Sequence, residues 1–218
     1  MKLSEKLYSN TMDLWNASAE KPFVAEMAEG TLEDRLFKNY TIQDYLYLLD
    51  YIEILKKIRS LSESEEMFSF LSTLIKGITN EVERVHLANI RKYGISDDEI
   101  KGFEKISAIS DYVSYMQKCI DDHGFYGGLT ALLQCSWLYA YIGETVVKKY
   151  SGKIAGSKYQ SWFEAYTSQS YLKTNQTWIN MLDSLGADLD DQTVEELSGV
   201  FRECAKYENK LWDALYEL

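Results

Sequence analysis

The amino-acid sequence predicts an all-α protein in which residues 1–218 form a single domain. The chain contains one proline, the residue that interrupts helices most strongly. Apolar residues recur at helical spacing along most of the chain, and capping patterns precede several of these segments. No segment alternates apolar and polar residues as a strand does, and no internal repeat of about 20 to 50 residues occurs.

The helices expected in the first half of the chain are marked by residues that suit helix ends. Pro22 fits the first turn of a short helix, and Gly30 fits its end. The segment 41–44 has the outline of a capping box, with Asp44 in place of the usual glutamate, and 96–99 is a regular capping box. The expected helices cover residues 6–19, 22–29, 32–40, 44–61 and 62–93, with a short helix after Ser96.

One helix in the second half, Leu129 to Val147, is apolar on nearly every face. A helix of this kind is buried on all sides, so we expect it at the centre of the domain. Gly127 and Gly128 precede it and would allow neighbouring backbone to approach closely. The other helices expected here are 110–122, one or two within 162–185, and 190–216, with breaks near Gly124 and at 151–156.

The composition excludes several classes of partner and favours a cytoplasmic protein. The net charge of −11 argues against binding to nucleic acid or to an anionic membrane. No apolar run reaches transmembrane length, and the N-terminus does not resemble a signal peptide. The cysteines, Cys119, Cys135 and Cys204, are odd in number and lack metal-type spacing, which fits a reducing compartment. The 17 tyrosines and five tryptophans could line a pocket for a flat heterocycle.

Several polar side chains stand out against this helical background, and each also has a purely structural interpretation. Cys135 and Tyr139 are four residues apart and therefore share a helix face, but most buried free cysteines only pack. Asp44 shares a face with Tyr47 and could simply cap a helix, while Glu208 could face solvent. The remaining candidates are tyrosines that could belong to the core, Tyr112 and Tyr166.

Six segments follow one another along the chain and carry a combined signal. They are Gly30-Thr31-Leu32 with Phe37, Tyr40 and Gln43-Asp44; Glu81 and His86; Tyr112 to Met116; Ala131 to Tyr139; Trp162 to Tyr166; and Glu208 with Trp212. Through these segments, in a single collinear order from Phe23 to Trp212, the sequence resembles the thiaminase II (TenA) family of aminopyrimidine hydrolases. The similarity covers almost the whole chain.

The resemblance implies a haem-oxygenase-like helical bundle, a homotetramer, and a pocket for an aminopyrimidine or thiamin inside each subunit. It implies that Cys135 is the nucleophile and Glu208 the proton donor, and that Asp44 holds the pyrimidine amino group and ring nitrogen. It further implies ring contacts from Tyr139 and Tyr166, a Tyr47 hydrogen bond that makes the cysteine more reactive, and a pocket wall that includes Tyr112. No metal or other cofactor is expected.

Two residues depart from the family pattern, and two other functions fit the same kind of fold. Gln134 replaces a proline before the cysteine, and Leu211 replaces an aromatic residue on the Glu208 face. One alternative function is a cofactor-dependent oxidase or di-iron protein on the same bundle, but only His86 and His123 could serve as histidine ligands. The other is a non-catalytic pyrimidine-binding or regulatory protein, which would not need a nucleophile such as Cys135.

Overall fold

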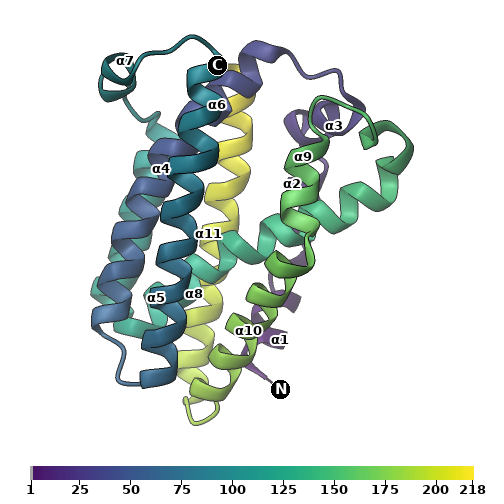
Figure 1. Ribbon diagram of the computed structural model, residues 1–218. Coiled ribbons are helices and arrows are strands. Elements are labelled where there is room, and N and C mark those ends of the chain that lie inside the picture. The colour runs from purple at the N-terminus through teal and green to yellow at the C-terminus, as the bar shows by residue number, and fades with distance from the viewer. Residues whose placement is uncertain (1) are drawn as a thin grey trace. The chain divides into compact units, whose positions relative to one another are not determined.

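The computed structural model describes residues 2–218, and every regular element in that range is a helix (Figure 1). The predicted all-α fold is therefore confirmed. The elements are α1 (Leu3–Ser9), α2 (Met12–Ala19), α3 (Pro22–Glu29), α4 (Asp34–Ser60), α5 (Glu65–Glu81), the π-helix η1 (Val82–His86), α6 (Leu87–Lys92), α7 (Asp97–Lys101), α8 (Ser107–Ile154), α9 (Gln160–Thr167), α10 (Gln169–Leu185) and α11 (Asp191–Glu217).

The helices form two compact units. Unit 1 contains the residues up to 32 together with 129–217, and unit 2 contains residues 33–128. In unit 1, α11 packs against α1, α2 and α3, while α10 packs against α9 and α1. In unit 2, α4 packs along α5, η1 and α6, as the parallel course of these ribbons shows in Figure 1. The long helix α8 contributes its first part to unit 2 and its later part to unit 1.

Helix α4 is longer than the sequence indicates. The prediction of separate helices over 32–40 and 44–61 is wrong, because one helix runs from Asp34 to Ser60. Thr41 lies inside this helix, and its hydroxyl donates to the carbonyl of Phe37, 2.9 Å away and four residues earlier. That local bond is available to threonine within a helix, so the predicted cap at Thr41 is not formed. The side chain of Asp44 is consequently not engaged in capping.

Two other predicted helices have different bounds in the structure. The expected helix 6–19 is divided into α1 and α2 near Asn10, whose side-chain amide donates to Ser198 Oγ at 2.9 Å. The segment 62–93 is helical only from Glu65, since Ser64 caps α5 by accepting from the backbone N–H of Met67. By contrast, the helix 22–29 and its end at Gly30 (φ 75°), and the capping box at Ser96, are confirmed.

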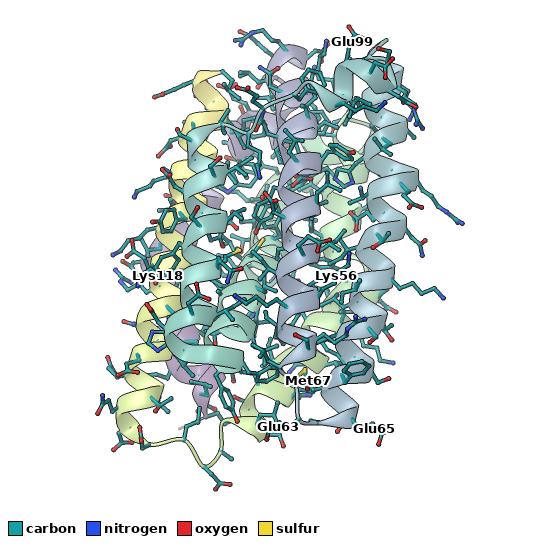
Figure 2. The ribbon with its side chains drawn as sticks, turned by 90° about the vertical axis from the view of Figure 1, so that its left-hand side faces the viewer. Lys56, Glu63, Glu65, Met67, Glu99 and Lys118 are labelled. Atoms are coloured by element: carbon teal, nitrogen blue, oxygen red, sulfur yellow. The ribbon has the colours of Figure 1, made fainter. Side chains whose placement is uncertain are left out.

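Acidic residues cluster where α5 begins. Figure 2 shows Glu63, Glu65 and Met67 at the turn between α4 and α5, with Glu99 at the opposite end of unit 2. Carboxylates at a helix N-terminus stabilise it by interacting with the unpaired N–H groups and the helix dipole. Met67 is fully buried and anchors this first turn in the core.

Helix α8 combines two predicted helices. The segments 110–122 and 129–147 belong to one element, which passes through Gly124 with a φ of 59°. This left-handed conformation locally redirects the backbone, and glycine adopts it without the steric penalty of other residues. The close approach of neighbouring backbone is confirmed at Gly127, where a Cβ would lie 2.2 Å from the carbonyl oxygen of Cys119. At Gly128 the close atoms belong to side chains, and a Cβ there would lie 2.6 Å from Ile120 and 2.8 Å from Ile58.

Burial on all sides, predicted for Leu129 to Val147, holds for the first part of this segment. All residues from 127 to 135 are buried, and Leu129, Ala131, Leu132 and Leu133 have no exposed surface. Beyond Cys135 the prediction is wrong, because Ser136, Trp137 and Tyr141 are half-buried and Glu144 is exposed. Despite this apolar character, no helix among residues 2–218 has the length and hydropathy needed to cross a bilayer.

Replacement of Gly127 by alanine tests the close approach inside α8. We expect Gly127→Ala to reduce the free energy of unfolding by about 1–3 kcal/mol or more, because the methyl group would overlap backbone atoms of Cys119. Gly77→Ala is the matched control, since Gly77 lies within α5 and, apart from the adjacent backbone of that helix, no described atom lies within 4 Å of the place that its methyl group would take. The control should gain about 0.5–1 kcal/mol. Urea unfolding of both variants measures the difference, and equal stabilities would contradict this close packing.

Candidate active site

Cys135 lies on the buried part of α8, and its side chain is nearly enclosed. The residue is 8% exposed, while the residues immediately before it have no exposed surface. Tyr139 follows one turn later and is also buried, so the predicted shared face of the two side chains is present. Gln134 is buried within the same helix, and the helix continues through it without a break.

Aromatic rings from three helices of unit 1 form a continuous cluster beside this face. The ring of Tyr139 lies 4.9 Å from that of Tyr166 and 5.6 Å from that of Trp212, measured between centroids. Trp162 lies 4.6 Å from Tyr166 and 6.4 Å from Trp212. The structure thus brings together Tyr139 from α8, Trp162 and Tyr166 from α9, and Trp212 from α11. We call these four residues the ring cluster.

Glu208 lies one helical turn before Trp212 on α11 and is 1% exposed. The interpretation that it faces solvent is therefore wrong. Leu211 is 5% exposed and also belongs to the packed interior. Cys135 and Glu208 each precede a member of the ring cluster by four residues, which places a thiol and a carboxyl group on helix faces that carry its rings.

Tyr171 contacts α8 beside Cys135, a contact that the sequence did not indicate. Its hydroxyl donates to the carbonyl oxygen of Ser136 at 2.9 Å and accepts from the Ser136 hydroxyl at 3.2 Å. Its ring also meets that of Tyr166 edge-on, with 5.2 Å between the centroids. Tyr171 therefore ties α10 to the residue that follows Cys135. The sequence near Tyr171 shows only that Ser168 can cap α10, and a cap does not predict a contact with Ser136.

In unit 2, the carboxylate of Asp44 pairs with His86. The Oδ2 atom of Asp44 lies 2.8 Å from Nε2 of His86, and each side chain is 11% exposed. Asp44 belongs to α4 and His86 ends the π-helix η1, so this contact joins two elements that pack side by side. The interpretation of Asp44 as a helix cap is wrong.

The two tyrosines predicted for the site in unit 2 lie next to one another. Tyr47 and Tyr112 stack with their rings 5.9 Å apart and inclined by 17°, and both are buried. Tyr51 extends this contact, with its ring 5.8 Å from that of Tyr47. The predicted hydrogen bond between Tyr47 and Cys135 joins residues of different units and stays a prediction.

Gln43, although adjacent to Asp44, has a structural role. Its Nε2 donates to the carbonyl of Glu104 at 3.0 Å, and its Oε1 accepts from the backbone N–H of Ile106 at 3.0 Å. Both amide atoms therefore hold the segment that precedes α8. Of these two adjacent residues, Asp44 is the one whose side chain could take part in chemistry.

The charges around His86 raise its pKa. Burial opposes protonation of the ring, but the hydrogen bond to Asp44 and the negative charges of Asp44 and Glu81 outweigh burial. Glu81 precedes η1, and its own pKa is raised by desolvation and by the charge of Asp44, against the opposing influence of His86. Unit 2 thus contains a coupled group of two acids and one histidine.

A groove of about 430 Å³ on unit 2 contains none of the predicted site residues. It lies between α4 and the first part of α8, and its lining includes Asp50, Glu53, Lys57, Gln117, Lys118 and Asp121. Both lysines are already engaged, Lys57 with Asp121 at 2.9 Å and Lys118 with Asp122 at 2.5 Å. The groove therefore offers no unengaged cation for an anionic ligand.

Comparisons with known proteins show the family and the fold of this chain. A family model described as the TENA/THI-4/PQQC family matches residues 8–218. An aminopyrimidine aminohydrolase of Helicobacter pylori is 30% identical, over 100% of both chains. Two solved structures share the fold: a TenA homologue protein from P. horikoshii OT3 (TM-score 0.83, 24% identity, covering 100% of this chain and 99% of the other), and a domain of unknown function with a haem oxygenase-like fold from Shewanella denitrificans OS217 (TM-score 0.77, 15% identity, covering 98% and 91%).

The fold is accordingly of the haem-oxygenase-like class, as the resemblance implied. Within that class, the chain belongs to the TENA/THI-4/PQQC family.

The pairing of His86 with Asp44 makes a testable prediction about stability and pH. A histidine whose folded-state pKa is raised stabilises the fold fully below its unfolded value of about 6.5, and this contribution is lost as the pH rises through the folded-state pKa. Because Asp44→Asn removes the charged partner, we expect its free energy of unfolding to fall less steeply above pH 6.5 than that of the parent protein.

Urea unfolding at intervals from about pH 5.5 to 8.5 measures this slope. Asp98→Asn is the control, since Asp98 is an exposed acid on α7 that forms its ion pair with Lys101, in the same helix. Identical pH profiles for the parent protein and Asp44→Asn would mean that the pair does not form in solution.

Proposed function

We propose that this protein hydrolyses thiamin-type aminopyrimidines and releases 4-amino-5-hydroxymethyl-2-methylpyrimidine from the 5-aminomethylpyrimidine, from thiamin, or from both. Such a C–N hydrolase would serve thiamin salvage. The observation that carries the proposal is the enclosed thiol of Cys135, on a helix face that continues into the ring cluster, together with the buried carboxyl group of Glu208. Family membership and the full-length similarity to an aminopyrimidine aminohydrolase support the same reaction.

The proposed reaction uses Cys135 as a nucleophile. A leaving group on the CH2 at C5 of an aminopyrimidine resists direct displacement by water. Addition of the Cys135 thiolate to a ring carbon removes the aromaticity, so that electrons from the ring nitrogen expel the leaving group. Water then adds to the exocyclic carbon and the thiolate departs, which restores the ring. One water is consumed, and the leaving group departs with a proton.

Glu208 and the aromatic side chains would support this sequence. Glu208 is buried on the part of α11 that also carries Trp212, and in the proposed reaction it would protonate the ring or the leaving group. Tyr139 and Tyr166 belong to the ring cluster, which offers aromatic faces and edges to a flat heterocycle.

We assign the residues of unit 2 to binding and activation in the same reaction. Asp44 would accept from the exocyclic amino group and contact the adjacent ring nitrogen. Tyr47 would hydrogen-bond the Cys135 thiol and increase its reactivity, and Tyr112, which stacks on Tyr47, would form part of the wall. We further propose that the protein is cytoplasmic and that it forms a homotetramer. Sedimentation analysis would test the homotetramer.

Incubation with 4-amino-5-aminomethyl-2-methylpyrimidine and with thiamin tests the proposed function, with hydroxymethylpyrimidine followed by chromatography. Cys135→Ser should reduce turnover by about 1,000-fold or more while the melting temperature stays nearly unchanged. Cys119→Ser and Cys204→Ser are matched controls, because both are buried free cysteines and should retain near-normal turnover. Cys204 is the more informative control, since it lies one turn before Glu208. Full activity of Cys135→Ser would overturn the mechanism, and no product from the parent protein would overturn the function.

The two acids should affect different kinetic constants. If Glu208 donates a proton, Glu208→Gln should lower kcat by about 10²- to 10⁴-fold with a smaller effect on substrate affinity. If Asp44 anchors the amine, Asp44→Asn should weaken the binding of hydroxymethylpyrimidine by about 10- to 100-fold. Steady-state kinetics and calorimetric titration separate these effects, and equal changes in kcat and affinity for both variants would argue against the division of roles.

A further inference from the structure

We propose that His86 is a positioning residue that orients the Asp44 carboxylate for the exocyclic amine of the substrate, through its Nε2 bond to Oδ2. This inference rests on the proposed function, in which Asp44 anchors an aminopyrimidine. It adds a residue that would not touch the substrate but would act through one that does.

The geometry of the pair leaves one carboxylate oxygen of Asp44 available. His86 Nε2 lies 2.8 Å from Oδ2, and both side chains are only 11% exposed. Among the described residues, no hydrogen bond to Oδ1 is formed, and His86 is the one hydrogen-bond partner of this carboxylate. A carboxylate held at one oxygen cannot rotate freely about its side-chain bonds, so the direction of the other oxygen is restricted.

The π-helix η1 gives His86 the position from which it reaches Asp44. Val82, His86 and Ile90 are all buried and follow one another at intervals of four residues. Four residues exceed an α-helical turn of about 3.6 residues, so such a series would drift around a regular α-helix. The wider π turn, closed by the bond from the N–H of Leu87 to the carbonyl of Val82, offsets this drift. His86 therefore keeps to the side of the helix that carries Val82 and Ile90.

The electrostatics of this site favour the protonated form of His86. Burial opposes protonation of the ring, but the hydrogen bond to Asp44 and the negative charges of Asp44 and Glu81 outweigh it and raise the pKa of His86. Hydrogen bonds between ionised partners are shorter and stronger than neutral ones. The contact with Asp44 is the side-chain hydrogen bond of His86, and the backbone of Glu81 also favours the protonated ring. The ring and the carboxylate thus orient each other.

Variants of His86 separate a positioning role from a packing role. His86→Leu removes the donor, and we expect it to weaken the binding of hydroxymethylpyrimidine by about 10- to 100-fold in calorimetric titration. His86→Gln retains an N–H donor at the end of its side chain, in the approximate position of Nε2, and should recover most of the lost affinity.

Ile90→Ala is the matched control for stability. Ile90 is fully buried one turn after His86, so its truncation should lower the melting temperature without changing affinity for hydroxymethylpyrimidine. The inference is overturned if His86→Leu binds as tightly as the parent protein, or if Ile90→Ala at a similar melting temperature loses as much affinity. It is also overturned if His86→Gln restores nothing. A parent protein that neither binds hydroxymethylpyrimidine nor hydrolyses its precursors contradicts the proposed function itself, and the positioning role with it.

Discussion

Enclosure of the later part of α8 is the constraint on which unit 1 depends. A helix that is apolar on every side can be stable in water only when other elements cover it all round. The ring cluster covers one face of α8 with side chains from α9 and α11, and Tyr171 from α10 is hydrogen-bonded to the backbone beside Cys135. Because the thiol lies in this enclosed segment, the same packing that stabilises the fold also determines the surroundings of Cys135.

Each unit contains a carboxyl group that its packing removes from most contact with solvent. An unpaired buried charge is strongly destabilising, so acids in a packed interior need partners. In unit 2, Asp44 lies 2.8 Å from His86, and this contact raises the pKa of the histidine in spite of its burial. In unit 1, Glu208 is 1% exposed, on the part of α11 that also carries Trp212.

Helix ends were predictable wherever their signal is local. Pro22 and Gly30 bound α3, and Ser96 forms its capping box with Glu99, because these effects involve only neighbours along the chain. The pattern at Thr41 is also local, and here the prediction from it was wrong. Its hydroxyl bonds to the carbonyl of Phe37, and Asp44 pairs with a residue 42 positions away, so the helix continues where a cap was expected. A local pattern cannot reveal that a stronger distant partner competes for a side chain.

By itself, the sequence determined the all-α class, the burial of α8 up to Cys135, and the shared face of Cys135 and Tyr139. Helical spacing fixes which side chains lie together on one helix, so these conclusions need no knowledge of the rest of the fold. Only the tertiary structure decided that Asp44 faces His86, that Tyr139 meets Tyr166 and Trp212, and that Tyr171 binds Ser136. These contacts join different helices, and the relative placement of packed helices depends on how all their side chains fit together, which no single segment encodes.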